Sequence, residues 1–161
     1  MIDGLLAVVL LAGPASAPAS VRAELAPLQF LVGSCWTGTF PDGKVTDTHC
    51  FEPVFGGQFI RDRHVVRGAK EPYEGESLHA WDPRKKSLVY TYWASNGTLS
   101  TGTAQPQPSG EIVFPEDHSS GSSIRSVWTP HADSYDVVVS EQTDDQWREL
   151  WRMTLKRQAS K

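Results

Sequence analysis

From Ser34 onward, hydrophobic and polar positions alternate with a period of two in short runs. Such alternation is typical of half-buried β-strands. Turn dipeptides separate the runs, among them Asp42-Gly43, Gly56-Gly57 and Asn96-Gly97. The pattern predicts about ten strands, over residues 34–40, 45–54, 58–67, 74–81, 87–94, 98–104, 111–115, 123–129, 135–142 and 146–156.

The short connections predict how these strands pair. Strands joined by short loops lie side by side and antiparallel, so the chain is expected to form an up-and-down meander. A meander leaves two open edges unless it closes on itself, which favours a barrel. The predicted fold class is therefore all-β, an up-and-down antiparallel β-barrel. A short helix is expected before it, over residues 21–28, broken by Pro27.

The first predicted hairpin brings the only two cysteines together. A turn centred on Asp42-Gly43 places Cys35 opposite Cys50. Pro41 has no N–H, which favours a four-residue loop and makes the cysteines a non-hydrogen-bonded pair. In such a pair the Cα atoms lie about 4.5 Å apart, close enough for a disulfide. The sequence predicts a Cys35–Cys50 disulfide; a free thiol pair or a metal site with two cysteine ligands are the alternatives.

The turn at Gly56-Gly57 extends the same register to the next strand. His49 then faces His64, and Phe51 faces Asp62. Residues 61, 63 and 67 are arginines, so the odd positions of this strand are expected to face water and the even positions the interior. The predicted inner wall therefore carries Trp36, Asp47, His49, Asp62 and His64.

Two histidines and two aspartates on an inner wall are a candidate functional site, because buried charges are costly unless they are paired. Three interpretations stay open: satisfied Asp–His hydrogen bonds near a wet barrel mouth, a ligand-orienting cluster, or metal binding or acid–base chemistry. Glu76 and Tyr90 on the next two strands join the candidate ligand-binding set, although the sequence does not fix which face of these strands points inward. We assign no metal site.

Composition narrows the function classes. The chain has 161 residues, of which 39% are hydrophobic and 10% aromatic, enough for the core of a single domain. The formal net charge of −4 argues against a nucleic-acid-binding protein, which usually has a basic face. No motif of a nucleophilic hydrolase, a zinc protease, a P-loop or a dinucleotide-binding fold occurs. We therefore expect no catalytic residue, no cofactor and, on balance, no enzyme.

The first residues read as an export signal. Residues 5–12 are apolar but too few to span a bilayer, and two A-x-A sites follow at residues 15–17 and 17–19. This predicts a cleaved signal peptide over residues 1–19, a single domain over residues 20–161, and a periplasmic or secreted protein without stable membrane insertion. Asp3 stands where a basic residue is usual, and a buried N-terminal helix is the alternative.

Three segments resemble a known family: residues 28–38, with Trp36 and Gly38 on the first strand, residues 56–63, and residues 73–76 followed by Trp81-Asp82-Pro83. Over about residues 26–156 the chain is similar to an uncharacterised bacterial family of exported lipocalin-like (calycin-type) barrels. It is more distantly similar to haem-binding nitrobindin-like barrels. The resemblance implies a barrel of about ten strands with a central cavity and no assigned activity. None of the five histidines matches the proximal haem ligand of nitrobindins.

Three functions follow as hypotheses. The first is binding of a small hydrophobic or amphipathic molecule in a barrel cavity in the cell envelope. The second is an enzyme that uses the inward Asp/His cluster for acid–base or metal-assisted chemistry. The third is an interaction protein whose barrel is filled by its own side chains. A cavity of at least about 300 Å³ would separate the first from the third.

Overall fold

The computed structural model describes residues 20–117 and 123–159. The signal peptide predicted over residues 1–19 lies outside the described residues. Within these residues, one 3₁₀ helix and ten strands follow one another. They are η1 (Ala23–Leu31), β1 (Ser34–Thr39), β2 (Thr46–Val54), β3 (Phe59–Arg67), β4 (Tyr73–Asp82), β5 (Ser87–Ala94), β6 (Leu99–Pro106), β7 (Ile112–Asp117), β8 (Ser123–Pro130), β9 (Ser134–Thr143) and β10 (Gln146–Arg157).

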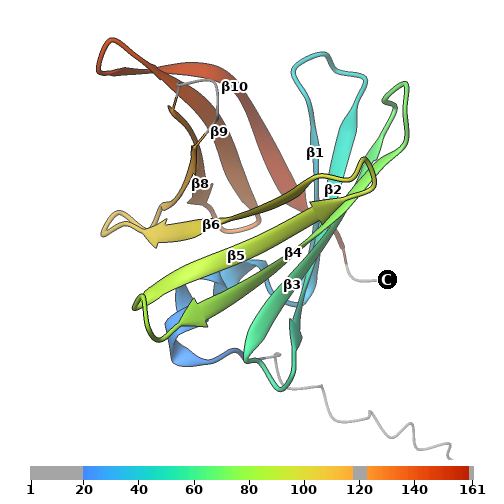
Figure 1. Cartoon of the computed structure of the whole chain (residues 1–161). Helices are drawn as coiled ribbons and strands as arrows, with labels where there is room; N and C mark the ends of the chain where they lie inside the picture. The colour runs from blue at the N-terminus through green and yellow to red at the C-terminus, as the bar shows by residue number, and fades with distance from the viewer. Residues whose placement is uncertain (1–19, 118–122, 160–161) are drawn as a thin grey trace, which may run out of the picture.

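The ten strands form a closed antiparallel barrel in which each strand pairs with its neighbours in sequence and β10 pairs with β1 (Figure 1). The predicted fold class is confirmed, and the predicted strand ends agree within two residues. The architecture is consistent with a lipocalin- or calycin-like barrel. Among the described residues, no helix has the length and apolar character needed to cross a membrane.

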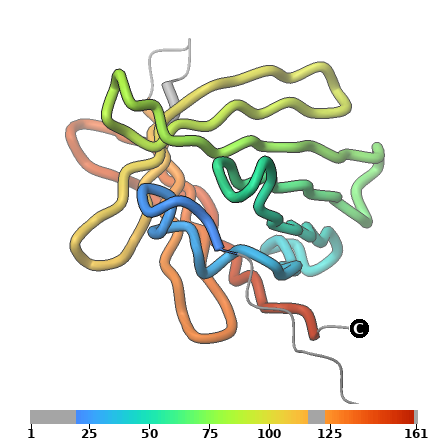
Figure 2. Tube along the Cα trace, turned by 90° about the horizontal axis from the view of Figure 1, so that it is seen from below, coloured from blue at the N-terminus to red at the C-terminus, as the bar shows by residue number. Residues whose placement is uncertain are grey.

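The helix covers one end of the barrel, where it crosses the opening in the view from below (Figure 2). It is a 3₁₀ helix that runs through Pro27, so the break predicted at this proline is wrong. Leu25, Leu28 and Leu31 recur every three residues, which matches the three-residue turn of a 3₁₀ helix. All three are fully buried and belong to the hydrophobic core. The apolar period, rather than the proline, thus decides the conformation here.

Trp36 lies under this helix at the centre of the core. Its side chain is fully buried, and its Nε1–H donates to the Leu31 carbonyl oxygen at 3.1 Å. Its ring packs edge-on against Phe30 and Tyr135, with centroid distances of 6.3 and 5.4 Å. The Arg157 guanidinium lies 4.2 Å from its centroid, which is a cation–π distance. Trp36 therefore joins the helix to both ends of the strand meander.

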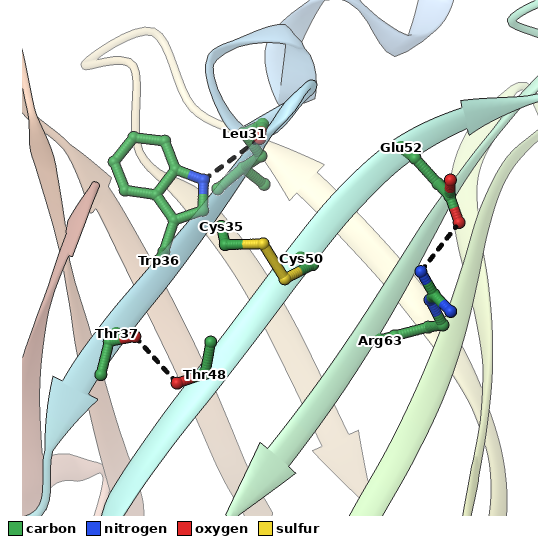
Figure 3. The surroundings of a disulfide bond; sticks show 8 residues. All are labelled: Leu31, Cys35, Trp36, Thr37, Thr48, Cys50, Glu52 and Arg63. Carbon is green, nitrogen blue, oxygen red and sulfur yellow. Dashed lines mark hydrogen bonds and ion pairs between the residues drawn. A yellow bond between two sulfur atoms is a disulfide. The ribbon is translucent and has the colours of Figure 1, made fainter. Parts of the chain in front are cut away.

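The disulfide forms where the first hairpin predicts it (Figure 3). Cys35 and Cys50 are directly opposite each other in the β1–β2 register, with their Cα atoms 4.0 Å apart. The Phe40 N–H donates to the Val45 carbonyl at 2.8 Å and closes the four-residue loop that Pro41 requires. The bridge lies on the outer face of the barrel, opposite to the side that carries Trp36.

We expect removal of the disulfide to lower the free energy of unfolding by about 3 kcal/mol, because the bond closes a loop of about 15 residues in the unfolded chain. The variant is Cys35→Ala with Cys50→Ala, measured by urea denaturation. Thr37→Ala with Thr48→Ala is the control, since it removes only the 2.8 Å hydrogen bond between the next outer pair of the same strands. Equal losses in the two double variants would contradict the expectation.

The barrel closes through two short seams. β6 and β7 pair only through Gln105–Val113 and Pro106–Ile112, and β1 and β10 only through Trp36–Arg157 and Thr37–Lys156. Along the rest of β6, residues 99–103 pair with β5 but with no residue of β7. A break in strand pairing therefore lies beside the interior in this part of the wall.

Candidate functional site

Four ionisable side chains meet on the inner faces of β2 and β3. The register places His49 opposite His64 and Phe51 opposite Asp62, as the second turn predicts. Asp62 and His64 are buried, whereas Arg63 between them has a side chain that is 58% exposed. The arginines of β3 therefore mark its outer face, as the sequence predicts, and Asp62 and His64 mark its inner face.

These side chains form a continuous hydrogen-bonded network. His49 donates from Nδ1 to Asp62 Oδ2 at 2.8 Å and from Nε2 to Asp47 Oδ2 at 3.2 Å. His64 donates from Nδ1 to Asp47 Oδ1 at 3.0 Å. The two imidazole rings are stacked, with centroids 4.7 Å apart and planes inclined by 15°. Asp47 thus bridges both histidines.

The network sets the charge of its members. Burial alone would lower the pKa of His49, but the charge of Asp62 and hydrogen bonds with Asp47 and Asp62 outweigh it and raise this pKa to about 10. Burial likewise acts against ionisation of Asp47, but hydrogen bonds from His49 and His64 hold its pKa well below the usual range. At neutral pH His49 is therefore an imidazolium that donates to both Asp47 and Asp62.

Two tyrosines extend the network across the barrel. His64 Nε2 lies 3.1 Å from the Tyr92 hydroxyl, which in turn hydrogen-bonds the Tyr73 hydroxyl. Gly75 makes this approach possible, because a Cβ there would lie 2.6 Å from both His64 Nε2 and the Tyr92 hydroxyl oxygen. Sequence reasoning assigned no role to Tyr73. A glycine inside a strand is the signal that could have pointed to a close approach here.

Asp47, His49 and His64 also form a set of metal-ligand types, with ligand atoms within 4.8 Å of one another. The arrangement does not fit a metal ion as it stands. The lone pair of an imidazole nitrogen lies in the plane of its ring, and two nearly parallel, stacked rings do not direct their lone pairs at one point. A metal ion would also have to displace the proton of His49. The geometry is that of an ion-paired network.

A cavity of about 700 Å³ adjoins the network. The inner faces of β2 to β8 line it, and it reaches the part of β6 that has no partner on β7. The rings of Tyr90, Phe114 and Trp128 form its aromatic wall, with Phe114 lying 5.9 Å from Tyr90 and 4.5 Å from Trp128 between centroids. This volume falls within the range of roughly 300 to 1,000 Å³ that is typical of small-molecule sites.

His79 is the functional candidate that the sequence did not place. It lines the cavity from β4, is 3% exposed, and packs against the rings of Tyr90 and Phe114. Neither of its ring nitrogens has a hydrogen-bond partner among the described residues. Burial lowers its pKa to about 4, so the ring is neutral at pH 7. Asp62 Oδ1 and the Tyr135 hydroxyl are also buried without a hydrogen-bond partner.

The structure separates the seven predicted ligand-binding residues into groups. Asp47, His49, Asp62 and His64 form the network, and Tyr90 lines the cavity. Trp36 faces inward but is enclosed in the core under the helix, so it does not line the cavity. Glu76 lies apart from the barrel cavity: it is opposite Arg63 and Trp93 on the outer face, because Gly75, Ser77 and His79 are the residues of β4 that point inward.

Comparison with known proteins gives no assignment for this site, since no protein-family model and no curated protein sequence matches the chain.

Proposed function

We propose that this protein binds a small amphipathic molecule in the barrel cavity. The observation that carries the proposal is a cavity of about 700 Å³ with aromatic rings on one wall and the buried, unpartnered nitrogens of His79 on another. Buried polar atoms without partners are uncommon in folded proteins and cost free energy. A ligand with an apolar body and a polar group would fill the cavity and supply the missing hydrogen bonds.

The charge state of the network favours binding over catalysis. A general base works best when its pKa lies near the operating pH. The pKa of His49 is raised to about 10, and its two nitrogens already donate to Asp47 and Asp62. This imidazolium has no free lone pair with which to accept a proton. We propose instead that His49 holds the carboxyl groups of Asp47 and Asp62 in place.

The cellular setting is part of the proposal. A disulfide is usual in proteins of oxidising compartments, and the apolar run with A-x-A sites before residue 20 fits an export signal. We place the protein in the periplasm or outside the cell, as a member of the exported lipocalin-like family that its sequence resembles. Mass spectrometry of the secreted or periplasmic protein would locate the mature N-terminus; retention of residues 1–19 would contradict cleavage.

Binding can be tested with N-phenyl-1-naphthylamine, a neutral fluorescent probe whose emission rises in apolar surroundings. We expect saturable binding to the purified protein. Ser100→Trp should weaken it by about tenfold or more, because Ser100 lies on the inner face of β6 and lines the cavity.

Leu99→Trp is the matched control for this test. Leu99 is the adjacent residue of the same strand, points outward and is 73% exposed, so its replacement should leave probe binding unchanged. Absence of saturable fluorescence in the wild type would overturn the proposed function. Equal effects of the two substitutions would place the probe outside the cavity.

A further inference from the structure

We infer that the ligand of this cavity is an organic ammonium ion, an amine carried on an aromatic or alkyl body. The inference rests on the proposed function and names the chemical class of its ligand. Three features of the interior support it: two buried carboxyl groups, polar atoms of Asp62 and His79 without hydrogen-bond partners, and the aromatic lining.

The interior holds two buried carboxyl groups. Asp47 and Asp62 are both buried, and the imidazolium of His49 lies between them. Both oxygens of Asp47 accept hydrogen bonds from histidines, whereas Asp62 uses only Oδ2. Buried carboxyl groups are stable when they are paired and hydrogen-bonded. A cation that donates a hydrogen bond to Asp62 Oδ1 would therefore be favoured.

Two unpartnered groups that line the cavity can accept a hydrogen bond. They are Asp62 Oδ1 and the lone-pair nitrogen of the neutral His79 ring, whose other nitrogen carries an N–H. The charge of Asp62 acts on the pKa of His79, which agrees with their place in the same cavity wall. A primary ammonium has three N–H donors and no acceptor, so it can donate to both groups.

The lining completes the match to a cation. Tyr90, Phe114 and Trp128 present aromatic rings to the same cavity that Asp62 and His79 line. The face of an aromatic ring attracts a cation, and the attraction is greater where water is excluded. A carboxylate ligand would instead lie beside the carboxyl group of Asp62, and a neutral alcohol would lack the attraction of a cation to the aromatic rings.

The test compares three ligands that share one phenyl ring and one short chain: 2-phenylethylamine, 2-phenylethanol and 3-phenylpropanoate. Their dissociation constants are measured at pH 7.5 by calorimetry and by displacement of N-phenyl-1-naphthylamine. We expect the ammonium to bind at least about tenfold more tightly than the alcohol, and the carboxylate to bind most weakly.

Asp62→Asn should bring the amine-to-alcohol ratio close to one while the alcohol still binds, because the side chain keeps its shape and loses its charge. Glu74→Gln removes one negative charge from the exposed outer face of β4 and should leave the ratio unchanged. If Asp62→Asn does not fold, His79→Leu is the second variant; it removes an acceptor without changing charge and should lower the ratio several-fold.

The two proposals fail in different ways. If the fluorescent probe binds in the cavity but the amine and the alcohol bind equally, the ammonium assignment is overturned, while small-molecule binding stands. A ratio that Asp62→Asn or His79→Leu leaves intact also overturns the assignment. If neither the fluorescent probe nor any of the three ligands binds, both proposals are overturned.

Discussion

Trp36→Ala is expected to lower the free energy of unfolding by about 3 to 5 kcal/mol, the range for removal of a large aromatic side chain from a core. Trp36 is fully buried and contacts the rings of Phe30 and Tyr135. Its loss would also leave the Leu31 carbonyl without its hydrogen bond and remove the partner of the Arg157 guanidinium. Few positions in the barrel combine so many contacts in one side chain.

The measurement is urea denaturation followed by far-ultraviolet circular dichroism. Trp93→Ala is the control, because Trp93 lies on the outer face of β5 and is 40% exposed. We expect a loss of less than about 1.5 kcal/mol for this control. If Trp36→Ala also loses less than about 1.5 kcal/mol, the expectation is wrong, and the helix and the core beneath it contribute little to stability.

His49→Leu is expected to be comparably destabilising, by about 3 to 5 kcal/mol at pH 7, because it leaves two buried carboxylates without their cation. Asp47 and Asp62 both hydrogen-bond His49 in the wild type. Replacing an imidazole by an isobutyl group changes side-chain volume little, so the loss would report the charge rather than a cavity. His131→Leu is the control, since His131 is exposed and pairs with Asp136 on the outer face.

The loss from His49→Leu should depend on pH in a defined direction. The pKa of His49 is raised from 6.5 in a free side chain to about 10 in the fold. Protonation of His49 therefore stabilises the folded state. This contribution is complete below pH 6.5 and disappears as the pH rises to about 10. Over this window the wild type should lose about 1.4 kcal/mol per pH unit through this group.

Denaturation of wild type and variant at pH 6, 8 and 10 measures this window. The stability difference between the two proteins should shrink steadily as the pH rises, and His131→Leu should run parallel to the wild type. A constant difference between wild type and His49→Leu from pH 6 to pH 10 would contradict a raised pKa at His49.

The first three strands are the part of the site that the sequence determines. The turns at Asp42-Gly43 and Gly56-Gly57 contain glycines with positive φ, so their positions in the sequence mark the register. From that register follow both the Cys35–Cys50 disulfide and the facing pair His49–His64. The three arginines of β3 then identify the outer face. Turn chemistry and charge alternation are local signals, which is why they can be read directly.

The register of β4 and β5 could not be predicted, because the turn between them has no clear sequence signal. Asp82 and Ser87 close the β4–β5 turn as a pair, and Lys86 adopts a positive φ of 51° in it. A lysine in that conformation is uncommon, so nothing in the sequence marks the loop length. The face of β4 stayed open for this reason, Glu76 was included in the ligand-binding set, and His79 was not. The Tyr73–Tyr92 extension also depends on this undetermined register.

The short β6–β7 seam has a consequence for how a molecule would enter. The cavity borders residues 100–103 of β6 and Phe114 and Pro115 of β7, and none of these residues pairs across the β6–β7 seam. For the proposed binding function, this means that a ligand would enter or leave between β6 and β7 without unpairing them, so exchange of the ligand would not require the barrel to unfold.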